Sequence, residues 1–337
     1  MTTDTSLDPP GIAGTPRPHR KLLRLSHAAL MTVAVSVTGG AIYETLASRG
    51  DAASYPPAGQ LVDVGGYRLH LDCRGSGSPT IVMDAGLGGS SLDWSLVQPV
   101  LSQSTRVCSY DRAGMGASEP GPEPRTPERI ATELHTLLEN AGIEGPLVLV
   151  GHSLAGKNIR MFAHDYPSDV AGMVLVDARS EEVDMALSVA ETDGFKGALN
   201  GQAMLYTVAR RLGIARLFGV ALLGQEPGVS HDLAQEMVLM QTTPNAIAAT
   251  TAEGMARSDD DRILANSTLG AMPLVVIAAK ESMDGIAGWP AAQKDLAALS
   301  TRGRLVVAPT GHAVQLEDPN LVIEAVQSVI ENVQTRN

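Results

Sequence analysis

An apolar run at residues 147–150 leads directly into Gly151-His152-Ser153-Leu154-Ala155-Gly156, and helical spacing follows from about residue 154. This order predicts a buried strand that turns sharply into a helix, with Ser153 at the corner. In such a turn the serine backbone is strained, and its Oγ projects over the carboxyl edge of a parallel sheet. The small residues Gly151 and Ala155 allow the strand and the helix to lie close together. The chain is therefore expected to build an α/β sheet around this corner.

The serine sequence departs from the usual pattern G-x-S-x-G, because Ala155 occupies the fifth position and Gly156 follows it. A serine at the start of a helix can also serve only as an N-cap residue. The strand before Ser153 and the helix after it favour a nucleophile instead. A neutral serine hydroxyl is a weak nucleophile, so this interpretation requires a base and an orienting acid elsewhere in the chain.

Strands and helices alternate along most of the chain, which predicts a mostly parallel sheet with helices on both faces. Eight segments have strand character, namely 60–64, 67–73, 80–83, 106–110, 147–150, 170–176, 274–278 and 304–308. Core helices are expected at 92–101, 127–141, 154–166 and 318–333. Residues 179–271 show only helical spacing and lie between the sixth and seventh strands. We expect an eight-stranded α/β core at 60–178 and 272–337, with 179–271 as a helical cap at the sheet edge where ligands bind.

The base is expected at His312, in the sequence Thr310-Gly311-His312 after the last strand. A loop at this place lies beside the carboxyl edge of the sheet and can reach the serine. The other histidines lie in the N-terminal segment, an early hairpin, two helices, the corner and the cap: His19, His27, His70, His135, His164, His152 and His231.

Three carboxylates are candidates for the orienting acid, which should lie between the serine and the histidine in the sequence. The usual place is the loop after the seventh strand, but Ser282 stands where an aspartate would be expected. Glu281 or Asp284 could serve if that loop were shifted. Asp177 ends the sixth strand, beside the serine strand, and is the favoured candidate, although an aspartate there can also be a turn or cap residue.

Acyl transfer also requires backbone donors for a developing oxyanion. We expect them to be the amides of Leu154, next to the nucleophile, and Leu87, after the third strand. The glycine-rich segment 84–89 contains neither G-x-G-x-x-G nor a P-loop, so a nucleotide site is not expected.

The N-terminal region differs in composition from the rest. Residues 1–24 are basic and rich in Pro, Thr and Gly, and we expect a disordered leader there. Residues 25–43 contain no Asp, Glu, Lys or Arg, and as a helix they would span about 28 Å, close to the apolar thickness of a bilayer. The segment 25–47 is expected to be an uncleaved anchor, with the bulk of the chain on the extracytoplasmic side. A signal peptide cleaved near 45–47 and a soluble helix remain as alternatives.

The overall composition limits the classes of partner. A formal net charge of −12 argues against nucleic acid, whose phosphates require a basic surface. With two cysteines, Cys73 and Cys108, and no His-Glu-x-x-His sequence, a metal site is not expected. The two thiols could be bonded in an exported protein or could be free and buried. Aromatic residues make up only 3% and the cap is rich in Met and Leu, which favours an aliphatic substrate.

Together these motifs resemble the α/β-hydrolase superfamily over about residues 60–334. The resemblance is carried by Gly86-Leu87, Asp111-Arg112-Ala113-Gly114-Met115-Gly116-Ala117-Ser118, residues 151–156 and Gly311-His312. Within the superfamily the chain is similar to bacterial esterase-type members with an N-terminal membrane segment and a helical cap. The resemblance implies that no cofactor is needed. It also implies that the second and fourth strands are neighbours, which would bring Cys73 and Cys108 together in a disulfide.

The activity that the resemblance implies is hydrolysis of a small-molecule ester, in which Ser153 attacks, His312 transfers the proton and Asp177 orients the imidazole. Relatives that open epoxides or displace halide carry an aspartate at the corner, so Ser153 argues against both reactions. A lactonase or an aminopeptidase with the same three residues remains open. A non-catalytic, membrane-tethered binding protein on the same scaffold is the alternative from a different class.

Overall fold

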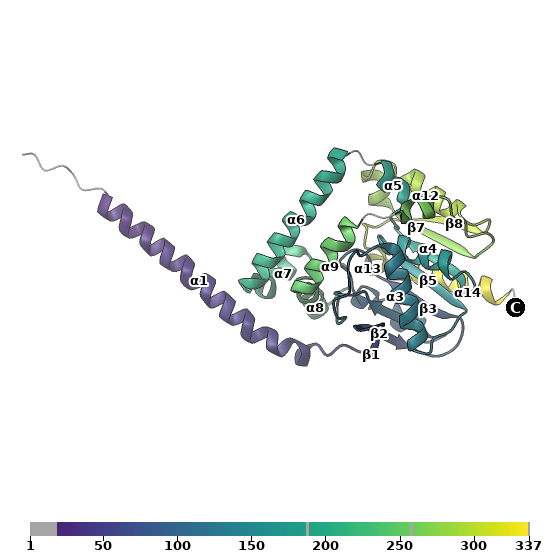
Figure 1. Cartoon of the computed structure of the whole chain (residues 1–337), viewed down its shortest axis with the longest axis horizontal. Coiled ribbons are helices and arrows are strands. Elements are labelled where there is room, and N and C mark those ends of the chain that lie inside the picture. The colour runs from purple at the N-terminus through teal and green to yellow at the C-terminus, as the bar shows by residue number, and fades with distance from the viewer. Residues whose placement is uncertain (1–18, 187–188, 257–258, 336–337) are drawn as a thin grey trace, which may run out of the picture.

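A sheet of eight strands forms the centre of the computed structural model, which describes residues 19–335 except 187–188 and 257–258 (Figure 1). The strands are β1 (Gln60–Asp63), β2 (Arg68–Arg74), β3 (Thr80–Asp84), β4 (Val107–Asp111), β5 (Leu147–His152), β6 (Val170–Val176), β7 (Leu274–Ala279) and β8 (Gly303–Ala308). Their order in the sheet is β1-β2-β4-β3-β5-β6-β7-β8. β2 pairs antiparallel with β1 and β4, and the other pairings are parallel. The expected α/β fold class is confirmed.

Both faces of the sheet are buried, which explains why residues 147–150 of β5 are continuously apolar. Leu147 and Leu149 join one hydrophobic cluster, whereas Val148 and Val150 join the cluster on the opposite face. The first face is covered by helices α3, α4 and α12, and the second by α2 and α14. The bounds of the helices around the sheet are α2 (Gln98–Leu101), α3 (Pro127–Asn140), α4 (Ala155–Asp165), α11 (Lys280–Gly285), α12 (Trp289–Ala298), α13 (Val314–Glu317) and α14 (Pro319–Gln334).

The region 92–101 differs from expectation, because two short pieces replace the single helix. The 3₁₀ helix η1 (Ser91–Trp94) is capped by the Ser90 hydroxyl, and α2 starts after a break. Pro99 lies in the first turn of α2, where its missing N–H is tolerated. The same ring disfavours a helix that continues from earlier residues.

Helices alone fill the insertion between β6 and β7. They are α5 (Glu181–Ala186), α6 (Val189–Arg211), α7 (Ile214–Leu223), α8 (His231–Gln241), α9 (Pro244–Met255) and α10 (Asp260–Ala265). α7 and α8 build a small core of their own, to which Leu316 of α13 contributes. α6 packs on α9 and α7, so the four helices α6 to α9 form one layer on the sheet edge.

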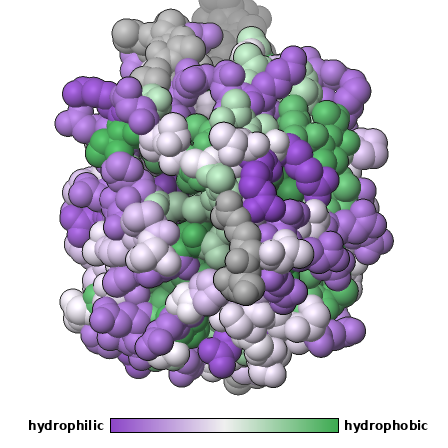
Figure 2. All heavy atoms as spheres, turned by 90° about the vertical axis from the view of Figure 1, so that its right-hand side faces the viewer, coloured by the Kyte–Doolittle hydropathy of each residue, from purple (hydrophilic) through white to green (hydrophobic). Residues whose placement is uncertain are grey.

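A long helix, α1 (His19–Ser54, 36 residues), precedes the sheet and extends away from it (Figure 1). It begins within residues 1–24, where a leader is expected, and most of that leader lies outside the described residues. Its stretch Ser26–Asp51 is long and apolar enough to cross a membrane, and only 6% of the most apolar part is buried inside the molecule. The opposite end of the molecule, near β8 and α14, carries many hydrophilic side chains with hydrophobic ones between them (Figure 2).

One disulfide links the two antiparallel strands β2 and β4. Cys73 and Cys108 are directly opposite each other in the register of these strands and are bonded. The expected disulfide is therefore present.

Candidate active site

Ser153 lies at the corner between β5 and α4, in a backbone conformation that side chains rarely adopt. Its φ is 53°, in the left-handed region. The Ser153 N–H donates to the Val176 carbonyl at 3.0 Å, which ties the corner to the end of β6. The corner thus has the strained strand-to-helix geometry that exposes a serine hydroxyl.

Two glycines make this corner possible. A Cβ on Gly151 would come within 2.8 Å of the Ile159 Cδ1, and a Cβ on Gly156 within 2.5 Å of the Ala178 Cβ. Ala155 is fully buried, and its methyl group is accommodated. Ala155 can stand where the motif usually has glycine, because it is Gly156 that comes close to Ala178 after β6.

His312 reaches the serine from the loop between β8 and α13. Its Nε2 lies 2.9 Å from the Ser153 Oγ, and its Nδ1 lies 2.6 Å from the Asp177 Oδ2. With the proton on Nδ1, the ring donates to the carboxylate and accepts from the hydroxyl. The structure therefore brings together all three residues that were favoured as nucleophile, base and acid.

Asp177 follows the last residue of β6 and is completely buried. Its φ is 40°, so it is the second non-glycine residue here with a left-handed backbone. Besides His312, its carboxylate accepts hydrogen bonds from the Ala279 N–H at 3.0 Å, the Ser282 Oγ at 2.5 Å and the Trp289 Nε1 at 2.8 Å. Although burial raises the pKa of Asp177, these hydrogen bonds, with that from His312 the largest, hold it below its ordinary value.

The two other candidates for the orienting acid lie near the site, but their carboxylates make other contacts. Asp284 is exposed and pairs with Lys280. Glu281 is also exposed, and its carboxylate lies beside Gly311. Ser282, which occupies the usual place of an aspartate, donates to Asp177 instead.

His152 supports the loop that carries His312. Its Nε2 lies 2.9 Å from the His312 carbonyl oxygen, and the two rings are 4.6 Å apart between centroids. Burial, followed by the nearby His312, lowers the pKa of His152 to about 3. His152 is therefore neutral and donates its Nε2 proton to that carbonyl.

The loop after β3 lies against the serine. A Cβ on Gly86 would be 3.2 Å from the Ser153 Cβ, so the backbone leading into Leu87 is next to the nucleophile. Leu154 is the N-cap residue of α4, at the positive end of that helix. Both expected oxyanion donors thus belong to segments that adjoin Ser153.

A buried arginine holds the loop after β3 in place. Arg112 Nη2 donates to the Gly86 carbonyl at 2.7 Å, and Nη1 donates to the Asp84 carboxylate at 2.5 Å. Its Nε and Nη2 both donate to the Glu253 carboxylate of α9, each at 2.9 Å. The network therefore joins the loop to the cap.

Sequence reasoning assigned no role to three residues of this site. The position of Arg112 within the Asp111–Ser118 motif could have indicated a role for it. Glu253 is the only charged residue of the apolar helix α9, and this isolated charge was a weaker indication. Nothing in the sequence around Trp289 indicated that its indole would bind the acid.

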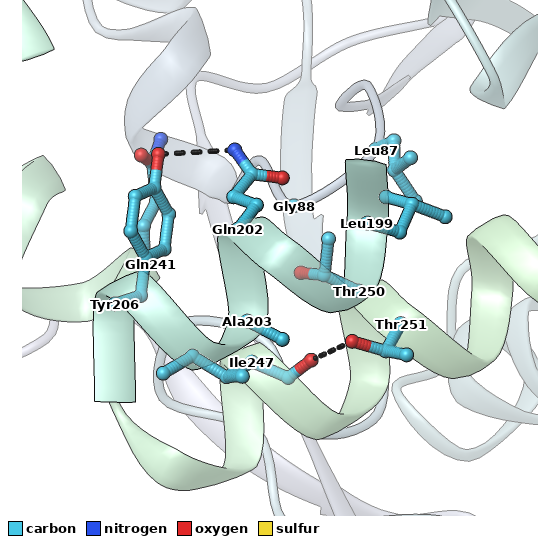
Figure 3. A pocket seen from close by; sticks show the side chains of 10 residues that line it. All are labelled: Leu87, Gly88, Leu199, Gln202, Ala203, Tyr206, Gln241, Ile247, Thr250 and Thr251. Atoms are coloured by element: carbon cyan, nitrogen blue, oxygen red, sulfur yellow. Dashed lines mark hydrogen bonds between the residues drawn. The ribbon is translucent and has the colours of Figure 1, made fainter. Parts of the chain in front are cut away.

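A small cavity lies between the loop after β3 and the helices α6 and α9 (Figure 3). Its volume is about 110 Å³. Its lining combines apolar and polar side chains: Leu87, Leu199, Ala203, Ile247, Gln202, Tyr206, Gln241, Thr250 and Thr251, with Gly88. Among the described residues, no group of three or more His, Cys, Asp or Glu could hold a metal ion.

Comparisons with known proteins agree with this fold. The family model described as the alpha/beta hydrolase fold matches residues 79–319. Among curated relatives, a protein from Hormonema carpetanum named as a probable transporter is 28% identical over 82% of this chain. The chain spans only 43% of the length of that relative.

Two solved structures illustrate the likeness in fold. The epoxide hydrolase CorEH has a TM-score of 0.64 and 20% identity, covering 81% of this chain and 98% of that one. A thermophilic esterase from Thermogutta terrifontis has a TM-score of 0.61 and 23% identity, with the same coverage of 81% and 98%. At such identities the likeness concerns the fold alone.

Proposed function

The chain belongs to the alpha/beta hydrolase fold family, and from that premise we propose that it is a serine hydrolase that cleaves carboxylic esters. The observation that carries the proposal is the chain of hydrogen bonds from Ser153 through His312 to Asp177, at 2.9 and 2.6 Å. This arrangement supplies a base for the hydroxyl and an orienting acid for the base.

The proposed reaction begins when the Ser153 Oγ attacks the ester carbonyl carbon and its proton passes to His312 Nε2. The amides of Leu87 and Leu154 stabilise the tetrahedral oxyanion. His312 then gives the proton to the leaving alcohol, and an acyl-serine remains. Water, deprotonated by His312, attacks the acyl-serine and releases the acid. Asp177 stays ionised throughout, in keeping with its lowered pKa.

The serine at the corner argues against epoxide opening, although a structural neighbour is an epoxide hydrolase. Cleavage of a lactone or of an aminoacyl amide would use the same three residues in the same order of steps. A binding protein without catalysis would have no need for the strained serine, the base and the buried acid together.

For the substrate we propose a small ester with aliphatic groups. The Leu87 and Leu199 side chains give the neighbouring cavity an apolar side, and its volume of about 110 Å³ suits a short group. Tyr206 and Thr250, which line the same cavity, could bind a polar substituent of that group.

We also propose that α1 crosses a membrane and that residues 60–178 and 272–337, with the cap 179–271, lie on the extracytoplasmic side. Leu30, Met31 and Val35 are each more than 60% exposed, an arrangement that water disfavours and a bilayer favours. The disulfide is compatible with an oxidising compartment.

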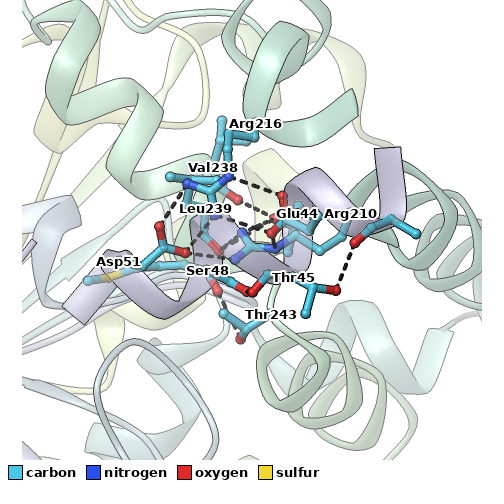
Figure 4. Close-up of polar contacts among 12 residues, drawn as sticks. Glu44, Thr45, Ser48, Asp51, Arg210, Arg216, Val238, Leu239 and Thr243 are labelled. Carbon is cyan, nitrogen blue, oxygen red and sulfur yellow. Dashed lines mark hydrogen bonds and ion pairs between the residues drawn. The ribbon is translucent and has the colours of Figure 1, made fainter. Parts of the chain in front are cut away.

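Contacts at the end of α1 support a retained anchor over a cleaved signal peptide (Figure 4). The Glu44 side chain is only 9% exposed and binds Arg210 and Arg216 of the cap. Cleavage near 45–47 would remove Glu44 and leave Asp51 as the remaining carboxylate partner of both guanidinium groups among the described residues.

Labelling with a fluorophosphonate probe tests the hydrolase. The full chain in detergent micelles is expected to react stoichiometrically at Ser153, and Ser153→Ala is expected to abolish the labelling. An unlabelled native chain would contradict the proposal and favour the binding protein. Initial rates on p-nitrophenyl esters of increasing acyl length, with lactones and aminoacyl anilides alongside, then separate the three bond types.

A further inference from the structure

Two consecutive helices of the cap, α6 and α7, expose six large apolar side chains. Single exposed apolar residues are ordinary on a protein surface, but contiguous groups mark contact surfaces. We use the name cap face for the six such residues of α6 and α7, each at least 44% exposed: Met204, Leu205, Val208, Leu217, Phe218 and Leu222.

The charge of this part of the chain is opposite to that of the whole. Residues 194–224 contain no Asp or Glu, while the chain carries 37 acidic residues and a net charge of −12. Four basic residues, Lys196, Arg210, Arg211 and Arg216, lie in the same stretch. Apolar side chains combined with basic ones are typical of helices that lie on anionic lipid.

The cap face begins where α1 joins the cap. Glu44 and Asp51 of α1 pair with Arg216 at 3.1 and 2.7 Å, and Asp51 also pairs with Arg210 at 3.1 Å (Figure 4). A Cβ on Gly40 would lie 2.3 Å from the Leu212 carbonyl oxygen, so α1 directly contacts the turn between α6 and α7. The apolar part of α1 continues outward from this contact (Figure 1).

We infer that the cap face lies on the surface of the bilayer that α1 crosses, with its apolar side chains in the boundary of the acyl chains and Arg211 near anionic headgroups. The inference rests on the proposed anchor. α6 also contributes Leu199, Gln202 and Tyr206 to the cavity beside the loop after β3. An ester dissolved in the membrane would therefore meet the cap helices before it meets water.

The experiment places an environment-sensitive nitrobenzoxadiazole label on single cysteines in the full chain, reconstituted in phosphatidylcholine vesicles with and without phosphatidylglycerol. The native thiols are bonded, so only the new cysteine reacts. Phe218→Cys reports the cap face, and Leu222→Cys repeats the measurement. Val307→Cys is the matched control, because Val307 is an exposed apolar residue of β8 with 47% exposure. Leu30→Cys reports the anchor.

Doxyl-labelled lipids are expected to quench the labels at residues 30, 218 and 222, and aqueous iodide is expected to quench the label at 307. Phosphatidylglycerol should increase the lipid quenching at 218.

A label at 218 that behaves like the label at 307 would overturn the inference while residue 30 still reports a working anchor. Disulfide-linked dimers of Phe218→Cys would identify a second copy of the chain as the occupant and also overturn it. Fluorophosphonate labelling of each variant shows whether it is folded, and its failure in all variants would concern the hydrolase proposal alone.

Discussion

Asp177 reaches His312 from the end of β6, where its backbone is left-handed. Three other donors hold its carboxylate there. The most informative of these donors is Ser282, which stands after β7 where an acid would be expected and bonds Asp177 at 2.5 Å. An aspartate at 282 would place a second carboxylate against the first, and both could not remain ionised there. Ser282 therefore suits an acid that comes from the neighbouring strand β6, because it donates a hydrogen bond to Asp177.

Asp177→Asn is predicted to lower kcat by about 10⁴-fold while the fold is kept. An amide group can donate to the Nδ1 of His312, which would favour the wrong tautomer of the imidazole. Steady-state hydrolysis of an activated ester measures the change. Asp284→Asn is the control, because Asp284 is exposed and pairs only with Lys280 among the interactions described. Full activity in Asp177→Asn, with loss in Asp284→Asn, would transfer the acid to the loop after β7.

His152 is predicted to make the protein less stable as the pH falls below about 6.5. Its pKa is lowered to about 3 in the folded chain, so between these two values the unfolded chain binds a proton that the folded chain does not bind. The free energy of unfolding then decreases with falling pH by at most about 1.4 kcal/mol per pH unit, and the contribution of His152 to this slope fades as the pH rises through about 6.5. Thermal unfolding midpoints at a series of pH values measure this slope.

His152→Gln is predicted to have a flatter dependence over the same range, because its amide can still donate to the His312 carbonyl but does not titrate. An unchanged slope in this variant would assign the pH dependence to other groups.

At the level of elements, the sequence was most informative where a pattern is local. The corner around Ser153 was predictable because β5 is apolar on both faces and is followed by small residues that only a sharp turn requires. The expectation of a single helix at 92–101 was wrong because Pro99 favours the start of a new helix, α2, at Gln98. The candidate acid was harder to choose because β6 and β7 are adjacent, so both strand ends lie within reach of the same histidine.

Side-chain contacts between distant elements could not be read from the sequence. Arg112 and Glu253 are 141 residues apart, and no local pattern connects a loop residue to a cap helix. Trp289 likewise reaches Asp177 across 112 residues. These contacts depend on how the cap and α12 pack on the finished sheet.

Glu253→Ala is predicted to destabilise the fold by about 3 kcal/mol and to lower kcat by about tenfold or more. It leaves the buried Arg112 with Asp84 as its remaining carboxylate, and Arg112 also fixes the Gly86 carbonyl beside Ser153. Chemical denaturation and ester turnover measure the two effects. Asp259→Ala is the control, because its pair with Arg262 is about 78% exposed and should change neither quantity appreciably. Equal behaviour of the two variants would mean that α9 does not hold the loop.

The molecule as a whole combines an α/β-hydrolase sheet with a long N-terminal helix, α1, which packs on the cap. Among the described elements, α1 packs chiefly on α6. Its orientation relative to the active site therefore depends on few contacts, and the ion pairs of Glu44 and Asp51 are the polar ones among them. An apolar segment at 25–47 could be predicted from the sequence, although the helix is longer, at His19–Ser54. Its attachment to the cap could not be predicted, because Glu44 and Arg216 are 172 residues apart.

The pair Glu44 and Arg216 is predicted to show a clear coupling energy, of about 1 kcal/mol or more, in a double-mutant cycle with Glu44→Gln and Arg216→Gln. Both side chains are largely withdrawn from water, at 9% and 13% exposure, so their attraction is weakly screened. Thermal unfolding of the full chain in detergent micelles supplies the four stabilities. The cycle of Arg68 and Glu119 is the control, because those side chains are 52% and 38% exposed and should couple more weakly. If both cycles gave the same small coupling, the cap would hold α1 by apolar packing alone, and the ion pairs would have no part in setting the angle at which the helix leaves the molecule.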